Sequence, residues 1–248
     1  MDPSTGFYRS GTLGIPSSYI LAGVFVLAIL FWFLMTLFRR TRNDYPIGYS
    51  HSLTSVFSVL TGAAILGYTL LDVTSQVQNP ASTPTWNKVM VGFSFFAGIA
   101  AAVSMIVGGI GSRFLRDGKP GAVLGIFPCL WQLVVLLARF NNLIAVTTLS
   151  DVLLNLLFMS FAAIFLLGQS RIIYGLGVRT SRTYAIPAGL SLSLAGFTLT
   201  IPNLLYAVSH GGFMSSVTIP LSETLYMLIL SLYAIVFLTG YAKSIRKV

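Results

Sequence analysis

Eight polar side chains within or beside long apolar stretches of this 248-residue chain are the ones that could do chemistry. They are Asp72, Gln132, Arg139, Asp151, Asn155, Asn203, Glu223 and Tyr226. Polar and charged groups are costly to bury unless they find partners or water. Carboxylate, guanidinium, amide and phenol groups together offer both donors and acceptors to a small polar molecule. We therefore take these residues as a candidate ligand-binding site.

The spacing of these residues predicts which side chains meet. Gln132 and Arg139 are seven residues apart, and Asp151 and Asn155 are four apart, so each pair shares one face of a helix. A helical hairpin through residues 140–150 would allow Arg139 to meet Asp151 or Glu223. An alternative stays open, in which charges at helix ends lie in a polar surface layer and the two acids cap helix starts, where the helix dipole is positive.

Catalytic patterns are absent from the sequence. There is no His-Glu-x-x-His zinc helix, no Gly-x-Ser-x-Gly elbow, no Cys-x-x-Cys pair and no phosphate-binding loop. The chain has one cysteine, Cys129, and two histidines, His51 and His210. Six acids and two histidines are few groups for acid–base chemistry. We expect no enzyme activity, no cofactor and no metal site.

The amino-acid composition indicates whether the eight candidate residues lie in a soluble domain or in a membrane. The chain is 55% hydrophobic and only 8% charged, against roughly 25% charged residues in soluble domains. It therefore reads as an integral membrane protein. The net charge of +9 would suggest nucleic acid in a soluble protein, but here the cations lie between apolar segments, so we exclude nucleic acid as a partner.

Seven stretches are long enough to cross a bilayer, which takes about 20 mainly apolar residues. The expected spans are 17–38, 53–73, 89–111, 120–139, 151–169, 185–208 and 220–243. The links between them are short, so we expect an all-α bundle of seven helices that forms a single domain over residues 1–248.

The cations orient this bundle. Of the 15 Lys and Arg residues, all but Arg9, Lys88 and Arg139 fall in four clusters. These clusters follow the first, third, fifth and seventh apolar stretches. The clusters are Arg39/Arg40/Arg42, Arg113/Arg116/Lys119, Arg171/Arg179/Arg182 and Lys243/Arg246/Lys247. Cytoplasmic loops of membrane proteins are rich in Lys and Arg. We therefore expect the amino terminus outside and the carboxyl terminus in the cytoplasm, which places the eight candidate residues toward the outer face.

Packing signals differ between the spans. The third span is rich in glycine and alanine, which let helix backbones approach closely, so we expect it at the centre of the bundle. The first span is nearly all bulky side chains and suits a lipid-facing place. Pro128 and Pro202 lie inside expected spans, and each should remove one backbone hydrogen bond and kink its helix.

The region 127–210 carries FPCLWQLVVLLARFNN, then SDVLLNLLFMSFAAIFLL and a basic loop. In this region, with Pro128, Trp131 and Asp151, the chain resembles a group of multi-pass membrane proteins of Gram-positive anaerobic bacteria. The group has no assigned activity. The resemblance implies a bacterial plasma membrane and assigns no catalytic or binding residue.

Two classes of function remain. The first is transport or binding of a small molecule through an outward-facing polar cavity, to which Tyr226, one turn after Glu223, would add a hydroxyl. The alternative is a non-transporting sensor or accessory subunit, because the spans lack the mid-membrane charge that many carriers use. Expected partners are the lipid bilayer and a small-molecule ligand, with a protein partner in the membrane or the cytoplasm left open.

Overall fold

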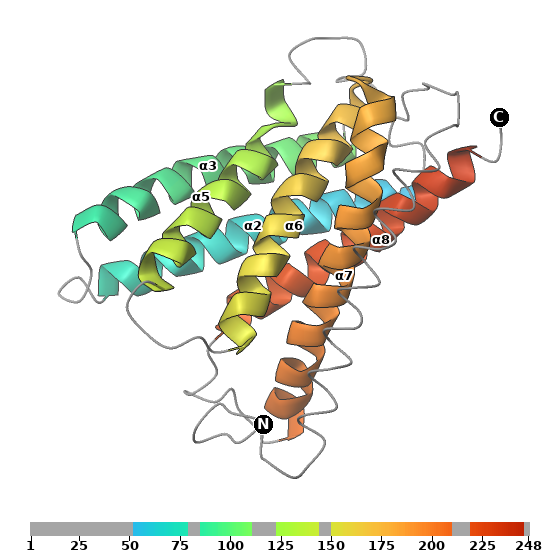
Figure 1. The fold of residues 1–248 in the computed structure, drawn as a ribbon. Coiled ribbons are helices and arrows are strands. Elements are labelled where there is room, and N and C mark those ends of the chain that lie inside the picture. The colour runs from blue at the N-terminus through green and yellow to red at the C-terminus, as the bar shows by residue number, and fades with distance from the viewer. Residues whose placement is uncertain (1–51, 79–84, 111–122, 144–149, 210–218, 246–248) are drawn as a thin grey trace.

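The computed structural model describes residues 52–78, 85–110, 123–143, 150–209 and 219–245, and its described part is almost entirely helical (Figure 1). The helices of this part are α2 (Ser52–Gln78), α3 (Thr85–Ile110), α5 (Phe127–Leu143), α6 (Ser150–Ile173), α7 (Val178–Ser209) and α8 (Leu221–Ile245). The expectation of an all-α fold is therefore confirmed. The expected first span, 17–38, lies outside the described residues.

Five of the described helices, α2, α3, α6, α7 and α8, are long and apolar enough to cross a membrane. They coincide with the expected spans 53–73, 89–111, 151–169, 185–208 and 220–243. The helix α5 is shorter, with 17 residues, and its apolar part covers Phe127–Phe140. Such apolar helices suggest contact with a lipid bilayer, and this architecture is compatible with a membrane protein.

Prolines lie where α5 begins and at two points within α7. Pro128 was expected to kink a continuous span, but α5 begins at Phe127, so Pro128 lies in its first turn. The helical stretch is interrupted just before it, because residues 123–124 are helical and residues 125–126 form a turn. A proline in the first turn of a helix costs no helix hydrogen bond, since the first N–H groups have no partner within the helix. Pro187 and Pro202 both lie inside the 32-residue α7, where each removes one backbone hydrogen bond.

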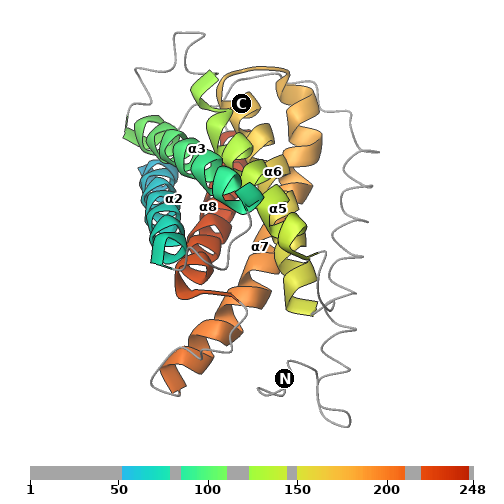
Figure 2. The same cartoon turned by 90° about the vertical axis from the view of Figure 1, so that its left-hand side faces the viewer.

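Each described helix packs against the next along the chain, and α8 packs against α2, which closes a ring. Figure 2 shows α8 passing between α2 on one side and α5 and α6 on the other. The Ser58 hydroxyl near the start of α2 donates to the Met105 carbonyl near the end of α3 (2.7 Å). The Ser104 hydroxyl of α3 donates to the Leu124 carbonyl just before α5 (2.6 Å). These contacts show that α2 and α3, and α3 and α5, run in opposite directions.

The helix α3 lies at the side of the described bundle, so the expectation that the third span is central is wrong there. Only 33% of its span residues are buried, against 61% in α7. Its small residues serve one face, where Gly98 lies against Thr69 of α2 and Trp131 of α5. The other face carries exposed bulky side chains such as Phe93 and Phe96. Small residues thus permit close contact on one side without burying the whole helix.

A tight turn joins α6 to α7. Gly175 and Gly177 have φ angles of 72° and 58°, in the left-handed region that glycine tolerates best. In the last turn of α6, Arg171 donates to the Leu176 carbonyl and to the Tyr184 hydroxyl of α7. The guanidinium also complements the negative end of the α6 dipole. We call this side of the bundle the Arg171 end, and the opposite side, where α8 begins, the Glu223 end.

Candidate functional site

The first turn of α8 positions the carboxylate of Glu223. The Thr224 amide donates to the Pro220 carbonyl (3.0 Å) as the helix starts, and Glu223 follows Leu221 by two residues. Its side chain is only 1% exposed. A carboxylate in the first turn gains from the positive end of the helix dipole. Glu223 is therefore a buried acid, and the alternative in which it lies in an exposed surface layer does not fit this burial.

Two other helices supply partners for both oxygens of this carboxylate. Arg139 near the end of α5 donates from Nη2 to Oε2 of Glu223 (2.5 Å) and forms an ion pair with it. Asn155 near the start of α6 donates from Nδ2 to Oε1 (2.8 Å). Between the two acids that the sequence left open for Arg139, the structure pairs it with Glu223. Both oxygens of the acid thus have a partner, as a buried charge requires.

A second polar contact lies deeper on the same two helices, one turn along α8 and two turns along α5. The Tyr226 hydroxyl of α8 donates to Oε1 of Gln132 on α5 (2.5 Å). Gln132 precedes Arg139 by seven residues, and Tyr226 follows Glu223 by three, so the two contacts are stacked along the α5–α8 interface. We call Gln132, Arg139, Asn155, Glu223 and Tyr226 the polar cluster.

Two further aromatic rings, those of Tyr68 and Trp131, pack against the Tyr226 ring of the polar cluster. The rings of Trp131 and Tyr226 meet edge to face, with centroids 5.2 Å apart, and Tyr68 of α2 stacks on Tyr226 at 5.7 Å. Tyr68 and Trp131 also meet edge to face at 6.0 Å. Such pairs add to the stability gained from burial alone. The cluster therefore lies against a packed aromatic wall.

Tyr68 and Asp72 extend the site onto α2. Arg139 forms a hydrogen bond with the Tyr68 side chain, and the negative charge of Asp72 acts on both of them. The sequence analysis named Asp72 but missed Tyr68. A signal was available, because Tyr68 precedes Asp72 by four residues and therefore lies on the same face of α2.

Three buried polar atoms at this site have no protein partner in the described part of the chain. They are Nε1 of Trp131, Nε2 of Gln132 and Oδ1 of Asn155. Two are hydrogen-bond donors and one is an acceptor. A buried polar atom without a partner costs about 1–3 kcal/mol, so these atoms favour an additional hydrogen-bonding group at the site.

Besides Asp72, which lies beside the polar cluster on α2, two of the eight candidate residues are not placed there. The side chain of Asp151 lies outside the described residues, although its backbone belongs to the first turn of α6. Asn203 is half-buried near the end of α7, and no hydrogen bond or ion pair among the described side chains joins it to the cluster. Six of the eight, Asp72 included, are therefore close to one another.

The polar cluster is equipped for binding, since it holds a carboxylate, a guanidinium, two amides and a phenol. Within the described ranges, no group of three His, Cys, Asp or Glu side chains is placed to hold a metal ion. Cys129, the single cysteine, is buried in the first turn of α5. The arrangement can exchange hydrogen bonds with a small polar molecule.

Comparisons with family models, with curated proteins and with solved structures found no match to this chain.

Proposed function

We propose that this chain is a plasma-membrane protein that binds and transports a small polar molecule through the polar cluster. The single observation that carries the proposal is the buried Glu223 carboxylate, which Arg139 and Asn155 hold from two other helices. Ionisable groups inside membrane helices are rare and usually serve a pathway or a site. A hydrophobic contact of the same size would stabilise the bundle equally well.

The proposal includes seven spans that form a single domain, with the amino terminus outside. The charge clusters of the sequence support this orientation, since they alternate with the apolar stretches. In this orientation the Glu223 end faces outward, and Arg139, whose side chain is 36% exposed, lies at the entrance of the site. A polar ligand would meet Arg139 first and Glu223 below it.

A ligand would form hydrogen bonds with the three buried polar atoms of the site that lack a protein partner. Nε1 of Trp131 and Nε2 of Gln132 offer donors, and Oδ1 of Asn155 offers an acceptor. A ligand with both donors and acceptors satisfies all of them, which offsets the desolvation of the ligand. The residues supply recognition and no catalytic group, so we propose a binding or transport role and no enzyme activity.

A sensor or accessory subunit is a second candidate, and the internal pairing and close packing of the polar cluster favour it. Every charged group of the cluster is paired, and aromatic rings fill the space beside it. Such a network can switch between two arrangements of the helices and thereby pass on a signal, without letting a solute cross. In this case a ligand would bind but would not cross the membrane.

A thermal-shift measurement on the purified protein in detergent tests the proposed site. The probes are amino acids, sugars, amines and short carboxylates. We expect at least one probe class to raise the melting temperature of the wild type and of Ser193→Ala, a buried serine variant on α7, but not of Asn155→Leu or Glu223→Gln. Equal stabilisation of all four proteins, or of none by any probe, would exclude a binding site here. Uptake of the binding probe into proteoliposomes then separates transport from sensing.

A further inference from the structure

Three arginines lie around the turn between α6 and α7, at the Arg171 end of the bundle. Arg171 lies in the last turn of α6, Arg179 in the first turn of α7, and Arg182 one turn later. Nη2 of Arg171 would lie 2.9 Å from a Cβ atom placed on Gly177, so its charge is close to the start of α7. We call Arg171, Arg179 and Arg182 the arginine cluster.

Neutral groups hold two members of the arginine cluster in place. Arg171 donates to the Leu176 carbonyl (3.3 Å) and to the Tyr184 hydroxyl (3.2 Å). Arg182 forms a hydrogen bond with the Tyr241 side chain near the end of α8. A carbonyl or a phenol orients a guanidinium but does not neutralise its charge. Both guanidinium groups are thus fixed in position, which lowers the entropy cost of binding an anion.

The described carboxylates lie at the other end of the bundle. Asp72 and Glu223, whose side chains the structure describes, belong to the Glu223 end and act on Arg139. Arg139 therefore has acidic partners there, whereas the described part of the chain brings no acid to the arginine cluster. The N–H groups in the first turn of α7 add the positive end of its helix dipole. This part of the surface therefore attracts anions.

An exposed apolar face of α7 continues from the arginine cluster. Leu190 and Ile201 follow Arg179 by 11 and 22 residues, and about 11 residues make three turns of a helix, so the three residues share one face. Leu190 is 37% exposed and Ile201 is 47% exposed. Leu194, one turn after Leu190, is exposed as well. A cation thus stands at the end of a span, and apolar side chains follow it along the helix.

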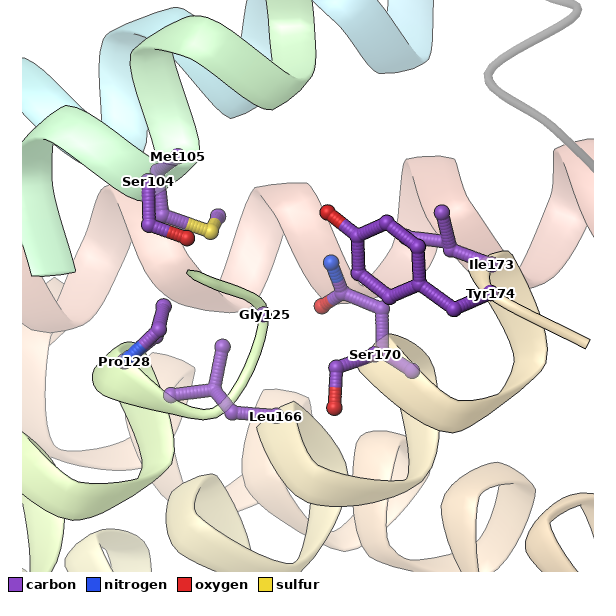
Figure 3. Close-up of a pocket in the computed structure, with 9 residues that line it drawn as sticks. Ser104, Met105, Gly125, Pro128, Leu166, Ser170, Ile173 and Tyr174 are labelled. Carbon is purple, nitrogen blue, oxygen red and sulfur yellow. The ribbon is translucent and has the colours of Figure 1, made fainter. Parts of the chain in front are cut away.

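A small hollow lies at the same end of the bundle, between α3, the start of α5 and the end of α6 (Figure 3). In Figure 3 the Tyr174 ring reaches from the end of α6 toward Ser104 and Met105. A Cβ atom on Gly125 would already collide with this ring. None of the lining residues is charged. The hollow has neither the charge nor the room for an anionic group, so an anion would bind on the outside, at α7.

A phospholipid matches both parts of this surface, because it joins a phosphate to apolar chains. Guanidinium groups form strong, often bidentate hydrogen bonds with phosphate oxygens, and anionic lipids attract basic segments beside membrane spans. We propose that the arginine cluster binds the phosphodiester of an anionic phospholipid such as phosphatidylglycerol, with an acyl chain along the exposed face of α7. This inference rests on the membrane part of the proposed function, and not on the polar cluster.

Melting temperatures of the full chain in detergent test the lipid site. Dioctanoyl phosphatidylglycerol and dioctanoyl phosphatidylcholine have the same chains and differ in the charge of the headgroup. The first should raise the melting temperature of the wild type in a saturable way, because a ligand of the folded state stabilises it, and the second should do so far less. Glycerol 3-phosphate, which has no chains, should have little effect. Raising the salt from about 0.1 to about 1 M should weaken the response, because the screening length falls from about 10 to about 3 Å.

Variants of the arginine cluster locate the response. Arg179→Gln and Arg182→Gln should each raise the Kd for phosphatidylglycerol about fivefold, which is the effect of one cation beside an anionic lipid. Tyr241→Phe keeps every charge but removes the hydroxyl that holds Arg182, so it should raise the Kd by a smaller factor. The matched control is Lys88→Gln, which removes the same charge near the start of α3, at the Glu223 end, and should leave the Kd unchanged. Arg179 is exposed, so Arg179→Gln keeps the test valid if Arg182→Gln does not fold.

Three outcomes would overturn the lipid site. They are equal stabilisation by phosphatidylcholine, equal stabilisation by glycerol 3-phosphate, and an equal loss of affinity in Lys88→Gln. Insertion of the wild type into phosphatidylcholine vesicles tests the membrane proposal separately. A protein that inserts but does not distinguish the two lipids contradicts this inference alone, whereas a protein that does not insert contradicts both.

Discussion

Arg139 and Glu223 are 84 residues apart in the chain, yet Nη2 of the arginine and Oε2 of the glutamate lie 2.5 Å apart. The pair joins the end of α5 to the beginning of α8. Its two members have unequal surroundings, because the arginine side chain is partly exposed and the glutamate is buried. The glutamate therefore depends on this pair for its counter-charge more than the arginine does, because the arginine also has exposed side-chain atoms.

The first prediction concerns this ion pair. Arg139→Ala should lower the free energy of unfolding by about 1–3 kcal/mol, less than the 3–5 kcal/mol of a fully buried pair because solvent screens the arginine. The loss arises because Glu223 keeps a buried charge without its counter-charge. Glu223→Gln in the same protein should recover part of the loss. Chemical unfolding in detergent measures Arg139→Ala, Glu223→Gln and the double variant.

Arg179→Ala is the control for the ion pair, since Arg179 is exposed on α7 at the opposite end. It should change stability by less than about 0.5 kcal/mol. If Arg139→Ala is as mild as Arg179→Ala, or if the effects of Arg139→Ala and Glu223→Gln simply add, the two residues are not coupled.

The second prediction concerns the contact between Tyr226 and Gln132. Tyr226→Phe should cost about 1–3 kcal/mol, because it leaves the buried carboxamide of Gln132 without the hydroxyl that bonds its oxygen. The double change Tyr226→Phe with Gln132→Leu should cost less than Tyr226→Phe alone, since neither polar group of this contact is then left behind without the other. A thermal-unfolding cycle over the four proteins measures the coupling. A double variant that loses the sum of the single effects would contradict the contact.

The third prediction compares two glycines of α3. Gly98→Ala should destabilise the bundle by about 1–3 kcal/mol through overpacking, because the new Cβ would lie 2.7 Å from Cγ2 of Thr69 and 3.0 Å from Nε1 of Trp131. Gly92→Ala meets nothing within 4 Å and should be neutral or stabilising by up to about 1 kcal/mol, since alanine favours the helix. Melting temperatures in detergent give the comparison. Destabilisation of similar size at both sites would show that Gly98 is not a close contact.

Hydropathy predicted most of the helices, because a long apolar stretch is recognisable in the sequence without any knowledge of its neighbours. The spans that became α2, α3, α6, α7 and α8 are all 20 or more residues long and mainly apolar, which is the length and composition that crossing a bilayer takes. The fourth span was predicted as one helix from residue 120, whereas α5 begins at Phe127 after a turn at residues 125–126. Hydropathy alone does not show this interruption, and Pro128 was predicted to kink a helix that begins beside it.

The candidate site was predictable only as far as helix faces allow. The spacing of Gln132 and Arg139 gave the correct face of α5, and that of Glu223 and Tyr226 the correct face of α8. The choice of Glu223 as the partner of Arg139 depends on which helices are neighbours in the ring, and no local pattern encodes this. The prediction that α3 is central was wrong for the same reason. Small residues show that a helix makes a close contact, but not how many of its faces are covered.

The last prediction tests the orientation of the proposed seven-span bundle. Reporter fusions at Asn43, Lys119, Gly177 and Val248 should all report the cytoplasm, because each position belongs to or adjoins one of the basic clusters. A fusion at Ser82, between α2 and α3, should report the outside and serves as the matched control. Replacing the three cations Arg171, Arg179 and Arg182 with asparagine should weaken the cytoplasmic signal at Gly177 more than at Val248. An outside signal at any of the four positions would remove or add a span, and the Glu223 end would then have to be reassigned.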